Sequence, residues 1–404
     1  MLVKSYADLL RTPGVGRIIA AQLVARFPGG MLSLAFLLHI YAITGSYASA
    51  GLVLAATSIG QATAGPLTSR WMGVGGMRRV LILTTVVCAI AIFTIALVSM
   101  SLPMYMAVGL VAGLSAPPVQ PAVRTIYPKM VNSQQLTPLF ALDASAQELI
   151  WIAGPVITTF VALQISTVLA IVLAGLFLVF GGAWFISSPE LGRVRIPRSA
   201  RSFGSVLRRP PVLLVTVTGF LLVGSCAAVE AGVVAVFRND GPQAGLILAI
   251  WAIGSIAGGL ALGHIPIGPW ALARRMFAVF AGLALAMLFL NFWWLAFALL
   301  IAGIGIAPAL AVIFAIVSSS VKFSDTAEAY GWVGTGQLIG AAVGSAAAGF
   351  TIDANGPIGA FWVATGFAFV GFLVPTVFRR WAPDLRGRDA SPIPDTQPVP
   401  LQPS

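Results

Sequence analysis

Residues 50–65 read AGLVLAATSIGQATAG, and residues 244–259 read AGLILAIWAIGSIAGG. The two stretches align without a gap at an offset of 194 positions, and eight of their sixteen positions are identical. Each belongs to a longer apolar run of about 20 residues, which is the length that a helix needs to cross the hydrocarbon core of a membrane. The repeat therefore predicts two related halves built from membrane-spanning helices. The identical positions include three glycine pairs: Gly51/Gly245, Gly60/Gly254 and Gly65/Gly259.

The composition of the whole chain supports this interpretation. Of its 404 residues, 58% are hydrophobic and only 9% are Asp, Glu, Lys or Arg, whereas an ordinary soluble domain has roughly 25% charged residues. Such a chain is too apolar for a soluble nucleic-acid-binding protein, despite its net charge of +11. Its two cysteines, Cys88 and Cys226, lie in apolar runs, which excludes a secreted disulfide scaffold. The composition indicates a polytopic protein of the lipid bilayer.

Apolar runs of spanning length occur twelve times along the chain. They are continuously apolar and lack the period-two alternation of a transmembrane β-barrel, so each is expected to be a helix. The least certain boundaries are the split at Asn291–Trp294 and the proline-rich end of the fourth run. The first run is longer than the core of a signal peptide and leads directly into further runs. The predicted fold is an all-α membrane protein with twelve transmembrane helices, at residues 18–40, 48–70, 79–99, 104–123, 138–161, 166–187, 212–236, 244–263, 275–293, 294–317, 327–350 and 357–378.

The positive charges predict the orientation of these helices. With both termini in the cytoplasm, 21 of the 23 Lys and Arg residues fall in segments on the cytoplasmic side, Arg124 and Lys129 among them. This is the bias expected of inner loops. Of the other two residues, Arg238 falls outside and Arg26 lies within a span.

The chain divides into four parts. We expect a six-helix half at residues 1–187, a basic cytoplasmic linker at 188–211, a second six-helix half at 212–380 and a disordered, Pro-rich tail at 381–404. The linker sets the orientation and meets anionic lipid, with a protein partner as the alternative. The tail is expected to be solvated, with a polyproline docking peptide as the alternative.

The loop after the second span gives the sharpest motif. It reads GPLTSRWMGVGGMRR over residues 65–79 and resembles the loop signature of the major facilitator superfamily, in which a glycine precedes an acidic-basic pair, a second glycine and a basic run. Ser69 stands where that family usually has Asp, so the usual latch of the inward-closed state is altered here. The resemblance implies alternating access between two halves, with the first, fourth, seventh and tenth helices lining a central cavity. The expected gating residues are Gly65, Ser69, Arg70, Gly73, Arg78 and Arg79, with fixed topology charges as the alternative role of the last two.

A second motif lies in the fifth span. Gly154-Pro155 resembles the Gly-Pro core of a motif carried by antiporters of the superfamily, although the flanking glycines are replaced by Ile150, Thr158 and Thr159. A proline inside a helix removes one backbone hydrogen bond and bends the helix. The stretches at 112–118 and 142–148 are also similar to bacterial efflux-permease-like members, which implies a bacterial inner membrane protein.

Four charged residues fall within the predicted spans, namely Arg26, Asp143, Glu148 and Glu230. An ionised side chain near the bilayer centre costs about 2.5–3.5 kcal/mol, so such residues are retained for pairing, for a wet cavity or for function. From the helical rise, Asp143 and Glu148 both lie at a depth that Arg26 can reach, whereas Glu230 lies nearer the outer end. We expect Arg26 to pair with Asp143 or Glu148 and one carboxylate to exchange a proton. The alternatives are a static ion pair and, for Glu230, a solvated residue at the outer rim.

The resulting functional expectation is a secondary transporter that exports a small apolar or amphipathic compound in exchange for protons. The alternatives are a proton-coupled importer of a sugar or organic solute and a non-transporting membrane sensor that kept the fold. The sequence holds no phosphate-cradling loop, metal-ligand cluster or nucleophile–base pair, so we expect no enzymatic activity, no metal and no cofactor. The expected partners are the substrate, protons and the lipid bilayer, with no nucleic acid, and the expected state is a monomer.

Overall fold

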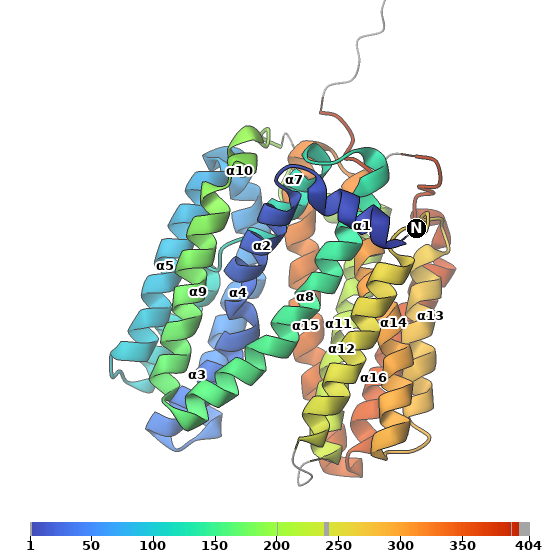
Figure 1. Ribbon diagram of the computed structural model, residues 1–404. Coiled ribbons are helices and arrows are strands. Elements are labelled where there is room, and N and C mark those ends of the chain that lie inside the picture. The colour runs from blue at the N-terminus through green and yellow to red at the C-terminus, as the bar shows by residue number, and fades with distance from the viewer. Residues whose placement is uncertain (1, 200, 238–241, 389, 396–404) are drawn as a thin grey trace, which may run out of the picture.

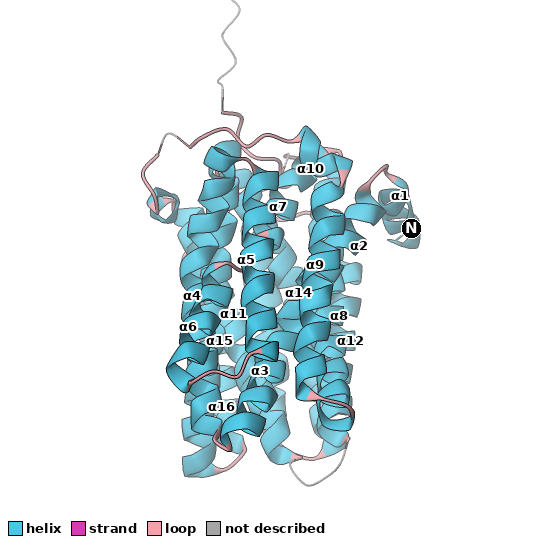
Figure 2. Ribbon diagram, turned by 90° about the vertical axis from the view of Figure 1, so that its left-hand side faces the viewer, coloured by secondary structure: helices cyan, strands magenta, loops and turns pink. Residues whose placement is uncertain are grey.

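A computed structural model describes residues 2–199, 201–237, 242–388 and 390–395 of the chain, and helices dominate these ranges. Figures 1 and 2 show the long helices running side by side along one axis. The only β-pairing in the described residues is an isolated bridge between Lys322 and Ile393. The first half comprises α2 (Val15–Arg26), α3 (Pro28–Thr44), α4 (Tyr47–Gly75), α5 (Met77–Leu97), α6 (Leu102–Leu114), α7 (Val119–Ile126), α8 (Ser133–Gln164) and α9 (Thr167–Ser187). The second half comprises α11 (Pro210–Val236), α12 (Gln243–Leu262), α13 (Ala271–Ala286), α14 (Phe292–Ser320), α15 (Phe323–Asn355) and α16 (Ile358–Val377).

The described helices include nine segments that are long and apolar enough to cross a membrane. The pairs α2–α3 and α6–α7 each count as one of these segments. Three further long helices are not among these nine segments. The helix α13 has only 16 residues, and α4 and α15 contain Gly, Ser and Thr among their apolar residues. These three helices pack among the other nine segments in the positions of the second, ninth and eleventh expected spans. The protein is a multi-pass, all-helical membrane protein, and twelve crossings with both termini inside remain a prediction.

Prolines break two of the expected spans. The first one is divided into α2 and α3 at Phe27, because Pro28 begins the second helix. The fourth is divided at residues 115–118, where Pro117 and Pro118 separate α6 from α7. A proline has no N–H to donate and restricts the residue before it, which favours a break in the helix at these two places. The uncertain boundary at Asn291 is a helix start, since its side chain accepts a hydrogen bond from the backbone N–H of Trp294 at 3.0 Å.

The repeated stretches occupy equivalent places in the two halves. In α4, a Cβ on Gly60 would lie 2.6 Å from the carbonyl oxygen of Leu110 in α6. In α12, a Cβ on Gly254 would lie 2.5 Å from the carbonyl oxygen of Leu300 in α14. In both halves, a side chain at the repeated glycine would therefore collide with the backbone of its neighbour, and only glycine permits this approach.

Short elements gather at one end of the bundle, which we call the linker end. It carries α1 (Leu2–Arg11), α10 (Pro189–Arg193), η2 (Ser205–Arg208) and η3 (Arg379–Trp381). Figure 1 shows α1, α7 and α10 at this end, together with the N-terminus and the start of the tail. Arg238, expected on the opposite side, lies outside the described residues.

The tail contacts the bundle within residues 381–388 and 390–395. The backbone N–H of Leu385 donates to the carbonyl of Ile267, and Ile393 exchanges hydrogen bonds with Val321 and Phe323 at 3.0 and 3.1 Å. The side chains of Leu385 and Ala390 are buried. The bundle thus supplies an apolar surface and backbone partners for this part of the tail, and the disorder of the tail remains a prediction. Residues 389 and 396–404 of the predicted tail lie outside the described residues.

The two halves contact each other mainly from the linker end to the middle of the bundle. The Tyr6 hydroxyl donates to the carbonyl of Leu260 at 3.0 Å, and Thr335 of α15 donates to the carbonyl of Ala62 in α4 at 2.7 Å. In Figure 1, α8 and α12 lie close together near the linker end and diverge toward the opposite end. The linker end is thus the closed end of the interface in this structure.

Candidate functional site

Asp143 of α8 is the centre of a buried charge network inside the first half. Its side chain is completely buried. One carboxylate oxygen, Oδ1, accepts hydrogen bonds from Gln22 at 3.0 Å, from Tyr127 at 3.2 Å and from Arg26 at 3.4 Å. The other oxygen, Oδ2, accepts from Nε of Arg124 at 2.9 Å. Four donors on α2, on α7 and just after α7 thus hold one negative charge in place.

Gln147, one helical turn after Asp143, joins the two arginines. Its side-chain oxygen accepts hydrogen bonds from both Arg26 and Arg124. The guanidinium of Arg124 also stacks on Phe314 of α14, with its central carbon 3.3 Å from the ring centroid. Because α14 belongs to the second half, this cation–π contact carries the network across the interface.

Arg124 corrects the charge assignment made from the sequence. It was placed among the cytoplasmic loop charges, yet it lies in α7 with a side chain that is 3% exposed. The prolines around it made the segment resemble a loop, and no contact between positions 124 and 143 can be read from a single sequence. Gln22, Tyr127 and Gln147 were missed as well. The available signal was the helical spacing of four between Gln22 and Arg26 and between Asp143 and Gln147, which puts each pair on one face.

The structure places Arg26 beside Asp143 and not beside Glu148. Glu148 instead faces the second half, where its Oε1 accepts a hydrogen bond from the Ser255 hydroxyl of α12 at 2.9 Å. The oxygen of that hydroxyl in turn accepts from the backbone N–H of Ala307 in α14 at 3.2 Å. A continuous hydrogen-bonded path therefore connects α8 with two helices of the other half.

Glu230 of α11 has an exposed side chain, although it belongs to a helix that packs against α14, α15 and α16. It interacts electrostatically with Glu148 and with Cys226, which lies one turn earlier on its own helix. Within the described part of the chain, neither glutamate forms an ion pair with a basic side chain, in contrast to Asp143. The structure thus brings Glu230 toward Glu148 and leaves it apart from the arginine network.

The loop motif lies where α4 meets α15, at the linker end. Arg70 donates to Oε2 of Glu328 at 2.8 Å and also to the carbonyl of Arg201 in the linker. The other oxygen of Glu328 accepts from the backbone N–H of Gly204 at 2.7 Å. Arg70, the residue that follows Ser69, therefore forms the ion pair between the halves. Ser69 itself is fully buried against Gly331, where a larger side chain would meet the backbone of α15.

The other residues of the loop motif lie apart from this ion pair. Gly65 packs against α15, and Gly73 packs against the carbonyl of Pro197 in the linker. Arg78 donates to the carbonyl of Ser188 at 3.1 Å, so it ties α5 to the end of α9, and Arg79 is exposed. Their gating roles remain predictions.

The Gly-Pro pair of the fifth span lies within α8 next to α3. A Cβ on Gly154 would lie 2.7 Å from the carbonyl carbon of Gly30, so the two backbones touch at this point. Pro155 is inside the helix, and its missing N–H leaves the carbonyl one turn earlier without its usual helical partner. The pair therefore brings α8 against α3, on the outer side of the charge network.

The described residues include no group of three or more His, Cys, Asp and Glu side chains that could hold a metal ion. What the site can do chemically is hold the Asp143 side chain between two arginines and present two further carboxylates near the interface between the halves.

The Arg70–Glu328 pair gives a first testable prediction. Replacing either residue with glutamine removes an ion pair between the halves that is mostly shielded from water, and we expect a loss of about 1–3 kcal/mol in stability. The double variant should cost less than the sum of the single variants, because the two residues act through one bond. The measurement is a double-mutant cycle from melting temperatures in detergent. Arg79→Gln, an exposed position of the same loop, is the control and should leave the melting temperature unchanged, whereas additive single effects would contradict the prediction.

The comparisons with known proteins agree with this architecture. The chain is similar to the human organic anion transporter MFSD10 (TETRAN), with 16% identity, a TM-score of 0.67 and coverage of 90% of this chain and 100% of that one. It is also similar to a bacterial homologue of the iron transporter ferroportin in an outward-facing state, with 12% identity, a TM-score of 0.72 and coverage of 90% and 98%. At such identities the likeness concerns the fold alone. No curated protein sequence matches the chain. The family model of the Major Facilitator Superfamily matches residues 18–290 and 228–403, so the chain belongs to this superfamily of transporters.

Proposed function

We propose that this protein is a proton-coupled exporter of the bacterial inner membrane, which moves a small apolar or amphipathic compound out of the cell by alternating access. Membership of the superfamily supports secondary transport. The observation that carries proton coupling is the contrast between the embedded acids: Asp143 has two arginine partners, whereas Glu148 and Glu230 have none among the described residues.

Asp143 is proposed to be a fixed charge. Its two oxygens accept four hydrogen bonds, two of them charge-assisted bonds from arginines. Its role in this proposal is to hold α2, α7 and α8 together while the two halves move.

Glu148 is proposed to be the main proton carrier, with Glu230 as its neighbour across the interface. A charged carboxylate without a basic partner is costly inside a membrane protein, and a bound proton removes that charge. Protonation of Glu148 also changes the hydrogen bond that its Oε1 accepts from the Ser255 hydroxyl. That hydroxyl links α12 and α14. Proton binding at this one carboxylate would thus alter a contact between the halves, which is the requirement for coupling proton movement to a conformational change.

The substrate class follows from the scarcity of polar side chains in the spans. A polyhydroxylated solute needs several hydrogen-bonding groups at its site, and the described helices hold few Asn, Gln or charged residues outside the Asp143 network. The partial Gly-Pro motif at Gly154 and Pro155 supports antiport and hence export. The monomer remains the proposed state.

Transport in reconstituted vesicles with an imposed pH gradient tests the proposal. With the linker end facing the medium and an acidic lumen, an exporter should accumulate a lipophilic substrate, and collapse of the gradient by a protonophore should release it. Accumulation only in vesicles of the opposite orientation would indicate an importer. No gradient-dependent movement of any compound from a panel of apolar, amphipathic and sugar-like solutes would indicate a sensor.

A further inference from the structure

A cavity of about 340 Å³ lies at the linker end, and its charged lining is entirely positive. Five residues line it, namely Lys129, Arg193, Val194, Arg195 and Phe323. They come from three parts of the chain, since Lys129 ends the short 3-10 turn η1 (Tyr127–Lys129), the two arginines begin the linker and Phe323 begins α15. The pocket therefore joins the first half, the linker and the second half at one point.

The acidic groups near this pocket are already engaged. Glu190 of α10 is bound by Arg17. Asp325 of α15 accepts a hydrogen bond from Ser199 at 2.6 Å and has Arg201 at 3.8 Å. Lys129, Arg193 and Arg195 make no ion pair with any described acid, and all three are exposed. Three cations that share a pocket without an acid repel one another, so a bound anion would lower the electrostatic energy.

One feature prepares the pocket for an anion. The ammonium of Lys129 lies 4.8 Å from the centre of the Phe323 ring, which holds this long side chain in place by a cation–π contact. Phe323 is also the first residue of the 33-residue helix α15. The first backbone N–H groups of this helix are already bonded within the chain, since that of Phe323 donates to the carbonyl of Ile393 at 3.1 Å and that of Ser324 donates to Asp395 of the tail at 3.3 Å. The anion is therefore expected to contact the three basic side chains and not the helix N-terminus.

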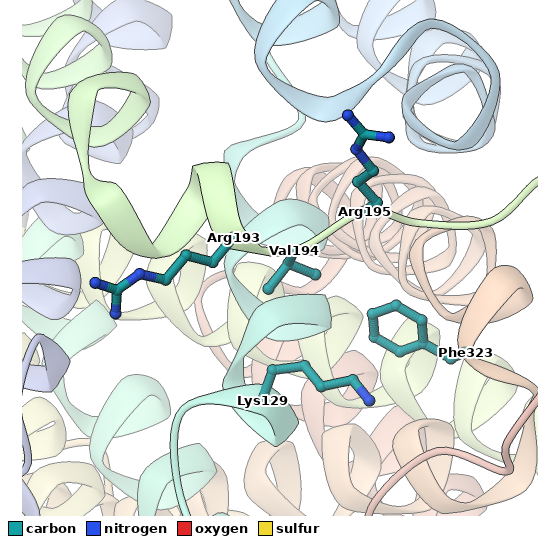
Figure 3. Close-up of a pocket in the computed structure, with 5 residues that line it drawn as sticks. All are labelled: Lys129, Arg193, Val194, Arg195 and Phe323. Carbon is teal, nitrogen blue, oxygen red and sulfur yellow. The ribbon is translucent and has the colours of Figure 1, made fainter.

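Figure 3 shows how these side chains lie. Lys129 and Phe323 face each other, with Val194 beside them, while the guanidinium groups of Arg193 and Arg195 extend away from the pocket in different directions. Exposed arginine side chains exchange rotamers within nanoseconds. Either arginine can therefore turn toward an anion seated over Lys129, and its planar fork suits a phosphate group in particular.

We propose that this pocket binds a phosphate-bearing anion, either the headgroup of an anionic phospholipid or a soluble phosphate compound. The bound phosphate would join Lys129 of the first half to the linker and to the start of α15, and so stabilise the closed linker end. The site is independent of the Glu148 and Glu230 carboxylates, so the proposal does not depend on proton-coupled export.

The test uses the full-length protein in detergent and a triple variant, Lys129→Gln with Arg193→Gln and Arg195→Gln. The matched control removes three exposed charges at the same end that do not line the pocket: Arg198→Gln, Arg208→Gln and Arg388→Gln. In the first arm, pyrophosphate is titrated by calorimetry at two ionic strengths. In the second arm, melting temperatures are compared in nanodiscs of phosphatidylglycerol and of phosphatidylcholine.

We expect the pocket variant to bind the anion about tenfold or more weakly than the control variant does, with weaker binding by both unaltered and control protein at high salt. Binding of pyrophosphate would identify a soluble phosphate compound as a source. Stabilisation by phosphatidylglycerol alone would identify the lipid headgroup. Equal behaviour of the pocket and control variants in both arms would overturn the proposal. If the triple variant does not fold, the single variants Arg193→Gln and Arg195→Gln answer the same question, because both residues are exposed and should each weaken binding.

Discussion

Exchange of Glu148 for glutamine is expected to abolish transport driven by a pH gradient and to leave the protein folded. Glutamine has nearly the same shape and still offers an oxygen to the Ser255 hydroxyl, so the contact at 2.9 Å can persist. What the variant lacks is a group that gains and loses a proton. We expect the gradient-driven rate to fall by about two orders of magnitude or more, the range typical for removal of a positioned proton-transfer group.

The measurement is initial uptake into vesicles under an imposed pH gradient, together with substrate exchange at equal pH on both sides. Exchange at equal pH should survive in Glu148→Gln, because it needs the conformational change but no net proton movement. Glu230→Gln should cause a smaller loss, and Asp353→Asn, which neutralises an exposed acid near the far end of α15, should cause none. Full gradient-driven transport by Glu148→Gln would contradict the assignment of this residue as the main proton carrier.

Removal of the Asp143 carboxylate is expected to have the largest effect on stability. In Asp143→Asn the two arginines at 2.9 and 3.4 Å lose the carboxylate that both contact, and among the described residues they have no other acidic partner. The surrounding helices keep both arginines away from water. Breaking a buried ion pair on one side costs about 3–5 kcal/mol, because an uncompensated charge remains. The variant should therefore melt at a much lower temperature in detergent or fail to accumulate in the membrane.

A compensating change distinguishes this electrostatic cause from a simple loss of packing. Adding Arg124→Gln to Asp143→Asn removes one of the two stranded charges, so the double variant should recover part of the lost stability. Asp353→Asn serves again as the control for loss of an acid. A double variant that is less stable than Asp143→Asn would show that the network acts through shape rather than charge.

The spans were predictable because each one is a local property of the sequence. A run of about 20 apolar residues must cross the bilayer wherever it lies, and its helix satisfies its own backbone. The breaks at Phe27 and at residues 115–118 were less visible, because prolines both interrupt helices inside a span and end helices at its edge. The contacts of the tail could not be predicted for the opposite reason: its backbone partners, Ile267 and Val321, are distant in sequence.

The sequence predicted the acids and one arginine of the site, but it did not predict which side chains contact one another. The sequence singled out four charged residues because an ionised side chain within a membrane span costs free energy. These residues are Arg26, Asp143, Glu148 and Glu230. The contacts among these residues depend on the orientation of α2, α7 and α8 about their own axes. The sequence pattern of a single helix does not give that orientation. For the same reason Arg124, whose sequence neighbours include three prolines, looked like a loop charge although it is the closest partner of Asp143.

The glycine pairs of the repeated stretches differ in what surrounds them. Gly60 and Gly254 each touch the backbone of a neighbour within their own half, and Gly65 and Gly259 each face side chains of the opposite half. At Gly60 and Gly254 a single methyl group would collide with backbone, whereas at Gly65 and Gly259 it would first meet a side chain of the opposite half. A Cβ on Gly51 or on Gly245 would meet no atom of another element within 4 Å, and nothing in the structure explains why glycine occurs there. Two of the three repeated glycine pairs therefore lie at points of tight contact, where the absence of a side chain lets neighbouring helices approach.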